Sequence, residues 1–275
     1  MRAAVLNKGE ILVRDDVPEP VPGPGQVLVQ VKACGICGSD LHFAKHGAEM
    51  LALGKRMQGG PRLGEGELDL DRDVYLGHEF AAEVLEVGPG TETPLVPGSL
   101  VTSVPVLLRA DGVDAIVYSN SVKAGYGERM LLAAPLMLPV PNGLPAHHAA
   151  LTEPMAVGLH AVNKSAVAAQ EKAVVLGCGP VGLAVIAALK VRGVRSIVAA
   201  DFSPARRELA AGLGATEVVD PRAETAWSRA GAGAPVVVFE AVGVPGMIDD
   251  VLRCAPAQSR VVVVGVCVGT DAINP

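Results

Sequence analysis

The chain has 275 residues, of which half are apolar and only 3% aromatic, and its net charge is −6. This length favours two domains, and the apolar fraction is enough for cores built from Val, Leu and Ala. An acidic chain without a basic cluster gives no support to a nucleic-acid or membrane partner. The first seven residues turn polar too soon for a secretory signal. Five cysteines do not suggest a disulfide framework, so a cytoplasmic protein is expected.

The first half of the chain is predicted to be rich in β-structure. Residues 3–6 and 11–13 are short apolar runs, and residues 26–33 alternate polar and apolar side chains, as a half-buried strand does. Residues 80–140 continue the β pattern. Residues 146–150 and 154–167 then predict helices that connect two domains.

The second half alternates apolar strands with amphipathic helices, which predicts a parallel sheet. Strands are expected near 173–177, 196–201, 216–219, 235–240 and 260–266, and helices near 180–192, 203–213 and 245–254. Residues 173–189 form an uncharged run of 17, which is short for a membrane span. Three glycines and a proline punctuate this run as strand, turn and helix.

A Gly-x-Gly-x-x-Gly pattern stands between the first of these strands and its helix, which is the context of a dinucleotide site. Gly177 allows the tight turn, Gly179 lets backbone approach a pyrophosphate, and Gly182 permits close helix packing. The phosphates would lie on free N–H groups at the helix start. Asp201, 19 residues after Gly182, is spaced to accept from a ribose 2′-hydroxyl. A glycine-rich turn that binds nothing is the alternative. The predicted cofactor residues here are Gly177, Gly179, Pro180, Val181, Gly182 and Asp201.

Several short motifs precede this pattern, in the order Cys37, Ser39-Asp40-x-His42, Gly77-His78-Glu79 and Glu153-Pro154. Together with the glycine pattern they resemble the zinc-dependent alcohol dehydrogenases of the medium-chain dehydrogenase/reductase superfamily. The Glu-Pro pair is most similar to the polyol, threonine and butanediol dehydrogenase branch. The resemblance covers the whole chain. It implies an α/β protein with a GroES-like catalytic domain at 1–150 and an NAD-binding Rossmann domain, a doubly wound parallel sheet, at 151–275.

The motif residues include a ligand set for an open zinc site, which needs a thiolate, an imidazole and often a carboxylate. Cys37, His78 and either Glu79 or Glu153 supply it, and the family uses either acid. Such a zinc polarises a substrate oxygen and lowers the pKa of a bound alcohol. Asp40 would fix the tautomer of the histidine ligand. No cysteine lies between positions 38 and 177, so one catalytic zinc and no structural zinc is expected.

The resemblance also assigns roles in hydride transfer between an alcohol or carbonyl compound and NAD. Ser39 would accept the substrate hydroxyl proton, and His42 would pass it to solvent through the cofactor ribose. Asp201 favours NAD over NADP because a carboxylate repels a 2′-phosphate, although the neighbouring Arg206 weakens that argument. The remaining predicted cofactor contacts are Arg206, Val242, Val266 and Val268.

Two other functions stay open. The chain could be a non-catalytic fragment that binds NAD or zinc, or a zinc-free reductase of the same superfamily. Cys34 and Cys37 together could form a redox pair or half of a structural zinc site. No thioredoxin-like pattern and no second Cys-x-x-Cys accompany them. The resemblance implies that only the second cysteine, Cys37, binds the metal, so Cys34 is expected to serve packing alone.

The chain departs from the family pattern at two places. Forty residues separate Cys37 from His78, about twice the family interval, so residues 47–73 predict an irregular insertion near the substrate entrance or a solvated loop.

Five strands are predicted after residue 151, whereas a full doubly wound domain has six. In the family the sixth strand pairs across a homo-oligomer, so the Rossmann domain is expected to be C-terminally incomplete, with strand 260–266 at an exposed edge.

Overall fold

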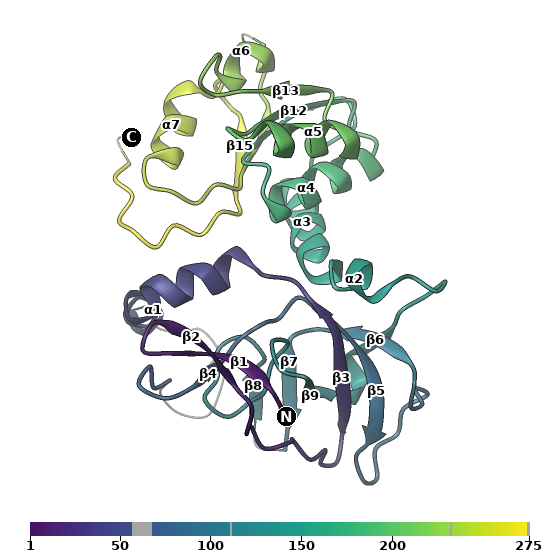
Figure 1. Ribbon diagram of the computed structural model, residues 1–275. Helices are drawn as coiled ribbons and strands as arrows, with labels where there is room; N and C mark the ends of the chain where they lie inside the picture. The colour runs from purple at the N-terminus through teal and green to yellow at the C-terminus, as the bar shows by residue number, and fades with distance from the viewer. Residues whose placement is uncertain (57–67, 111, 232, 274–275) are drawn as a thin grey trace. The chain divides into compact units, whose positions relative to one another are not determined.

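The computed structural model describes residues 1–56, 68–110, 112–231 and 233–273. The chain divides into two compact units, Met1–Glu153 and Pro154–Pro275, each with its own core. Figure 1 shows β-structure in the first unit and alternating strands and helices in the second. Among the described helices, none combines the length and hydrophobicity that a bilayer crossing requires.

The first unit is built on antiparallel sheets. Its five-stranded sheet has the order β10-β6-β5-β3-β9, with strands at Met137–Pro139, Leu100–Ser103, Phe80–Val87, Gln26–Cys34 and Arg129–Ala133. A three-stranded sheet has the order β2-β1-β4, at Glu10–Arg14, Ala3–Asn7 and Val74–Tyr75, and β7 (Val106–Arg109) pairs with β8 (Gly112–Ala115). The core between these sheets includes Val27, Val29, Val84, Met130 and Leu132, none of which is exposed to solvent.

The prediction of an irregular insertion at 47–73 is wrong for its first ten residues. Helix α1 runs from Gly38 to Arg56, with non-helical backbone angles at His46. Residues 48–53 are strong helix formers, and partly buried Met50 and Leu51 pack on the cluster that contains fully buried Phe43. Packing and propensity therefore continue the helix beyond the kink. Residues 57–67 lie outside the described residues, and with them Gly59-Gly60-Pro61, Glu65 and Glu67 of the predicted insertion.

Two helices follow the β-structure. Helix α2 covers Ala146–Ala149, and α3 covers Thr152–Ser165. A one-turn 3-10 helix, η1, lies at Ala134–Leu136.

The second unit contains a parallel sheet in the order β13-β12-β11-β14-β15. The strands are Glu217–Val219, Ser196–Ala200, Lys172–Leu176, Val237–Glu240 and Arg260–Val263, and the helices α4 to α7 are Pro180–Val191, Pro204–Leu213, Ala226–Ala230 and Met247–Cys254. The order reverses between β11 and β14, and in doubly wound sheets a ligand binds at that point, outside the carboxyl ends of the strands. The short helix α6 was not predicted.

The last strand ends at Val263, three residues earlier than predicted. The amides of Val264 and Gly265 both donate to the carbonyl oxygen of Glu240, at 2.8 Å each. Two successive residues bonded to one carbonyl cannot continue a regular ladder, so the chain turns away there. Among the described residues, β15 pairs with β14 alone and forms an edge of the sheet.

Candidate metal and cofactor sites

Cys37, His78 and Glu79 form one group in the first unit, in which the potential ligand atoms all lie within 4.8 Å of one another. The strand register explains this proximity. Cys34 at the end of β3 is paired with Phe80 at the start of β5. Residues just after β3 therefore meet residues just before β5. His78 and Glu79 are buried and Cys37 is half-buried.

Asp40 connects two members of this group. Its Oδ2 accepts hydrogen bonds from the Cys37 amide at 3.3 Å and from the Tyr126 hydroxyl at 2.7 Å. Its Oδ1 lies 3.6 Å from His78 Nδ1, and both of these buried atoms lack a hydrogen bond. One carboxylate thus bonds to the cysteine loop and also lies beside Nδ1 of the imidazole, so that Nε2 is the ring nitrogen away from Asp40. Tyr126 was missed by sequence reasoning, and its position between Gly125 and Gly127 was the one available signal.

The carboxylate of Glu79 requires a glycine beside it. A Cβ at Gly35 would lie 2.2 Å from Glu79 Oε2, and the Gly35 amide donates to the Glu79 carbonyl at 2.7 Å. Cys34 does not belong to the ligand group among the described residues. Burial raises the pKa of its thiol to about 12, and Asp40 and Glu79 add to the effect.

Glu153 stands in the first turn of α3, half-buried and outside the three-residue group. Burial raises its pKa, His78 acts in the opposite direction, and Glu79 and Asp40 raise it further. It is therefore within electrostatic range of the group. Of the two acids that the sequence left open, Glu79 is the one that lies with Cys37 and His78.

Ser39 and His42 belong to the first turns of α1, three residues apart and so on neighbouring positions of the helix surface. Burial raises the pKa of the Cys37 thiol, while hydrogen bonds from Ser39 act to lower it. The His42 ring is half-buried, and its centroid lies 6.5 Å from that of His46. Ser39 is thus in contact with the ligand group.

The glycine turn of the second unit has the features of a dinucleotide cradle. Gly177 has φ +89°, and a Cβ there would meet Ala241 O at 2.9 Å. A Cβ at Gly182 would lie 1.9 Å from Gly177 O, so α4 packs directly on the turn. A Cβ at Gly179 would meet nothing within 4 Å, and this residue caps α4 just before Pro180 and Val181. The turn therefore leaves open space at a helix N-terminus, the kind of position at which free N–H groups can bind an anion.

Asp201 braces this turn. Its Oδ2 accepts from the Cys178 amide at 2.8 Å, and its Oδ1 accepts from the Ser203 amide at 2.7 Å. Arg206 Nη1 lies 3.7 Å from Oδ2 and is largely exposed. Arg207 instead donates to the backbone carbonyl of Asp201 at 2.7 Å. Of the two arginines, Arg206 is the one beside the acidic side chain.

The chain after β14 meets both the glycine turn and the chain after β15. A Cβ at Gly177 would lie 2.9 Å from Val242 Cγ2, and one at Gly243 would lie 2.6 Å from the Val266 amide nitrogen. Fully buried Glu240, missed by sequence reasoning, holds this loop by accepting from the amides of Val242 and Gly243 at 2.7 and 2.8 Å. Val268, half-buried, follows five residues after β15.

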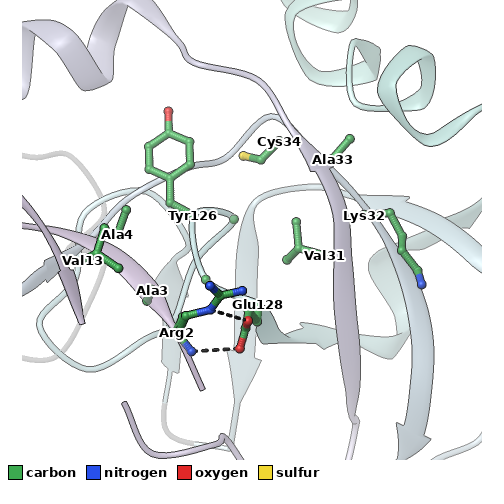
Figure 2. A pocket seen from close by; sticks show the side chains of 12 residues that line it. Arg2, Ala3, Ala4, Val13, Val31, Lys32, Ala33, Cys34, Tyr126 and Glu128 are labelled. Carbon is green, nitrogen blue, oxygen red and sulfur yellow. Dashed lines mark hydrogen bonds and ion pairs between the residues drawn. The ribbon is translucent and has the colours of Figure 1, made fainter. Parts of the chain in front are cut away.

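An open surface hollow of about 390 Å³ in the first unit includes Tyr126 of the Asp40 network in its lining (Figure 2). Figure 2 shows Tyr126 and Cys34 together on one side of the view and the Arg2–Glu128 ion pair on another. Tyr126 is shared with the Asp40 network, whereas Cys37, His78 and Glu79 do not line this space. This hollow is therefore distinct from the ligand group.

Comparison with known proteins matches each of the two units to a known protein family. Residues 23–142 match the alcohol dehydrogenase GroES-like domain, and residues 180–275 match the zinc-binding dehydrogenase family. The chain is 34% identical to (R,R)-butanediol dehydrogenase of Bacillus subtilis, over 100% of this chain and 80% of that protein, and 33% identical to the Neisseria gonorrhoeae enzyme of that name, over 96% and 77%.

Solved structures agree with these matches. The crystal structure of 2R,3R-butanediol dehydrogenase from Bacillus subtilis has a TM-score of 0.77 at 31% identity, covering 100% of this chain and 80% of that one. A protein from Sinorhizobium meliloti, described as a zinc-binding dehydrogenase bound to NADP, has a TM-score of 0.81 at 28% identity, covering 100% and 79%.

This chain belongs to the zinc-dependent alcohol dehydrogenases of the medium-chain dehydrogenase/reductase superfamily, in the branch of butanediol and polyol dehydrogenases. It is a zinc-dependent oxidoreductase that exchanges a hydride between an alcohol or carbonyl compound and a nicotinamide cofactor. The predicted fold class, a GroES-like domain followed by a Rossmann domain, is confirmed. The donor set fits zinc, because a thiol, an imidazole and a carboxylate converge and a buried acid stands behind the imidazole.

Proposed function

We propose that Cys37, His78 and Glu79 hold the catalytic zinc of this enzyme, with Glu153 as a carboxylate that exchanges with Glu79. The observation that carries this assignment is the convergence of the three ligand atoms within 4.8 Å. The proximity of Asp40 Oδ1 to His78 Nδ1 supports Nε2 as the ligand atom. Glu153 is half-buried and its pKa responds to His78, which supports its place near the metal.

When bound, zinc supplies a Lewis acid that polarises the substrate oxygen. The bound nicotinamide supplies the hydride acceptor for alcohol oxidation. Ser39 accepts the proton that leaves the substrate hydroxyl, while its own proton moves toward His42. His42 then releases a proton to solvent. Tyr126 and the Cys37 amide keep the Asp40 carboxylate in place, so that His78 stays oriented.

NAD is the preferred cofactor in this proposal. The side chain of Asp201 is only 9% exposed and lies at the turn where the adenosine ribose would bind, and its charge opposes a 2′-phosphate. The NADP in the Sinorhizobium meliloti structure favours the opposite choice, and Arg206 would be the residue to accommodate it. The ratio of NAD to NADP affinity decides between them.

The substrate class proposed is a secondary alcohol next to a second oxygen, as in a vicinal diol or a hydroxyketone. Similarity to two (R,R)-butanediol dehydrogenases supports this class. Small diols and their monohydric analogues, supplied with NAD, test it by steady-state kinetics.

Replacing Cys37 by Ser tests the zinc assignment. The variant is expected to lose bound zinc and alcohol oxidation, because a neutral hydroxyl is a far poorer zinc ligand than a thiolate. NAD affinity should stay nearly unchanged, since the glycine turn belongs to the other unit. Zinc is measured by elemental analysis and NAD by fluorescence titration. The matched control is Cys254→Ser, an exposed thiol on α7. Stoichiometric zinc in Cys37→Ser would overturn the assignment.

A further inference from the structure

The side chain of Tyr118 is held against the helix that carries Ser39. Its ring stacks on that of Phe43, with a centroid distance of 3.9 Å and an interplanar angle of 9°. Phe43 is 1% exposed and lies four residues after Ser39 on α1, so the two side chains share a face of the helix. The stack therefore places the phenol of Tyr118 at the start of α1.

The hydroxyl oxygen of Tyr118 is buried, and among the described residues it has no hydrogen bond of good geometry. Burial raises the pKa of the phenol to about 12, with the Ser39 hydroxyl acting in the opposite direction and with Asp40 and Cys37 adding to the rise. The phenol thus keeps its proton at neutral pH. A buried donor without a partner is unfavourable, so this hydroxyl is expected to find an acceptor. The Ser39 hydroxyl is the neutral polar group that acts on this phenol, and its Oγ can accept a hydrogen bond.

We propose that Tyr118 is a positioning residue that donates a hydrogen bond to Ser39 Oγ and so fixes the orientation of that hydroxyl. This inference rests on the proposed role of Ser39 as proton acceptor. With one acceptor site of Oγ occupied by the phenol, the other faces the substrate hydroxyl, and the Ser39 proton points away from both. The Tyr118 proton stays on the phenol throughout, and Ser39 takes one proton as it gives up another.

Tyr118→Phe removes only the hydroxyl and keeps the stack on Phe43. We expect kcat for oxidation of 2,3-butanediol to fall about 3- to 10-fold, the effect of one neutral hydrogen bond, with KM, zinc content and melting temperature little changed. The discriminating measurement is a double-mutant cycle with Ser39→Ala. Because Tyr118 acts through Ser39, Tyr118→Phe should cause no further loss of kcat when Ser39 is already absent.

The matched control is Tyr75→Phe, which removes another phenol of the first unit, one that lies on β4. It should leave kcat unchanged with either residue at position 39. Equal losses from Tyr118→Phe in the presence and absence of Ser39 would overturn the inference, as would no loss in either. Those outcomes leave the proposed function standing. A wild-type protein that binds no zinc and oxidises no alcohol would instead remove the proposed function, and this inference with it.

Discussion

At the scale of single residues, Asp40 and Asp201 have similar hydrogen-bonding roles in the two units. Each is an acid whose two oxygens serve different partners. Asp40 connects the cysteine loop to the imidazole. Asp201 connects the glycine turn to the residue that caps α5. An acid that organises backbone amides is pre-oriented for a further ligand, because its rotamer is already set before the ligand arrives.

Asp201 provides the residue-scale prediction. Asp201→Gly is expected to weaken NAD binding by about 1–3 kcal/mol, the worth of a hydrogen bond to a charged acceptor. NADP binding should fall less, because the charge that repels its 2′-phosphate is also lost. Titration of both cofactors by fluorescence gives the two affinities.

Glu224→Gln is the control for Asp201→Gly, since it removes a carboxylate of the same unit that pairs with Arg229. It should leave both cofactor affinities unchanged. An unaltered NAD to NADP ratio in Asp201→Gly would contradict the ribose assignment.

At the scale of elements, the glycines of the turn between β11 and α4 have different structural roles. The backbone oxygen of Gly177 occupies the place where a Gly182 side chain would start, whereas the space beside Gly179 is open. Gly182 is therefore needed for the packing of α4 on the turn. Gly179 is not needed for packing, and its missing side chain leaves space for a ligand.

This contrast predicts opposite outcomes for two alanine variants. Gly182→Ala should lower the free energy of unfolding by roughly 2–3 kcal/mol, because the helix must move off the turn. Gly179→Ala should cost only about 0.5–1 kcal/mol, the penalty for alanine at a helix N-cap. Its NAD affinity should nevertheless fall about tenfold, since the methyl group stands where the pyrophosphate approaches.

Denaturant unfolding and cofactor titration measure the two effects separately. Each variant serves as the control of the other, because both add one methyl group to the same turn. Equal stability of the two variants would show that α4 tolerates the displacement, and normal NAD binding by Gly179→Ala would place the pyrophosphate elsewhere.

At the scale of the whole molecule, both units carry carboxylates whose pKa is lowered by an arginine. Most of them are exposed pairs of small individual worth, such as Glu128 with Arg2 and Glu224 with Arg229. Asp73 differs because it accepts hydrogen bonds from residues of two strands. Its carboxylate accepts from Arg14 on β2 at 2.9 Å and from Asn7 on β1 at 2.6 Å.

The pKa of Asp73 predicts the direction of its pH dependence. The Arg14 hydrogen bond lowers this pKa, burial opposes the effect, and Asn7 adds to it. A carboxyl whose pKa is lower in the folded state stabilises the fold fully above its ordinary pKa of about 4, and loses this effect as the pH falls through the lower folded value. Asp73→Asn should therefore lower the melting temperature at pH 7, and the difference from wild type should shrink below about pH 4.

Melting temperatures across the pH range test this, with Glu92→Gln as the control. Glu92 is exposed, and its substitution changes the net charge by the same amount. A destabilisation by Asp73→Asn that persists unchanged at low pH would mean that packing, and not the charge, is the cause.

Strand and helix periodicity predicted most of the described second unit from sequence, apart from α6. Its five strands and three of its helices follow from apolar runs separated by glycine and proline, because parallel strands buried on both faces leave a strong local signal. The long helix α1 was missed, since its amphipathic pattern is weak and what holds it is the contact of Phe43, Met50 and Leu51 with distant residues.

The family and the order of the two domains could be predicted from the sequence alone, together with candidate residue types for each site. These depend on short motifs whose chemistry is local, such as the glycine turn and the spaced cysteine, histidine and acids. That Glu79 lies with Cys37 and His78, while Glu153 stands outside the group, follows from the folded chain, because the register of β3 against β5 brings the first three residues together. The same holds for Tyr126 and Tyr118. Their hydroxyls reach Asp40 and the neighbourhood of Ser39 across 86 and 79 positions of the chain, and no local pattern records such contacts.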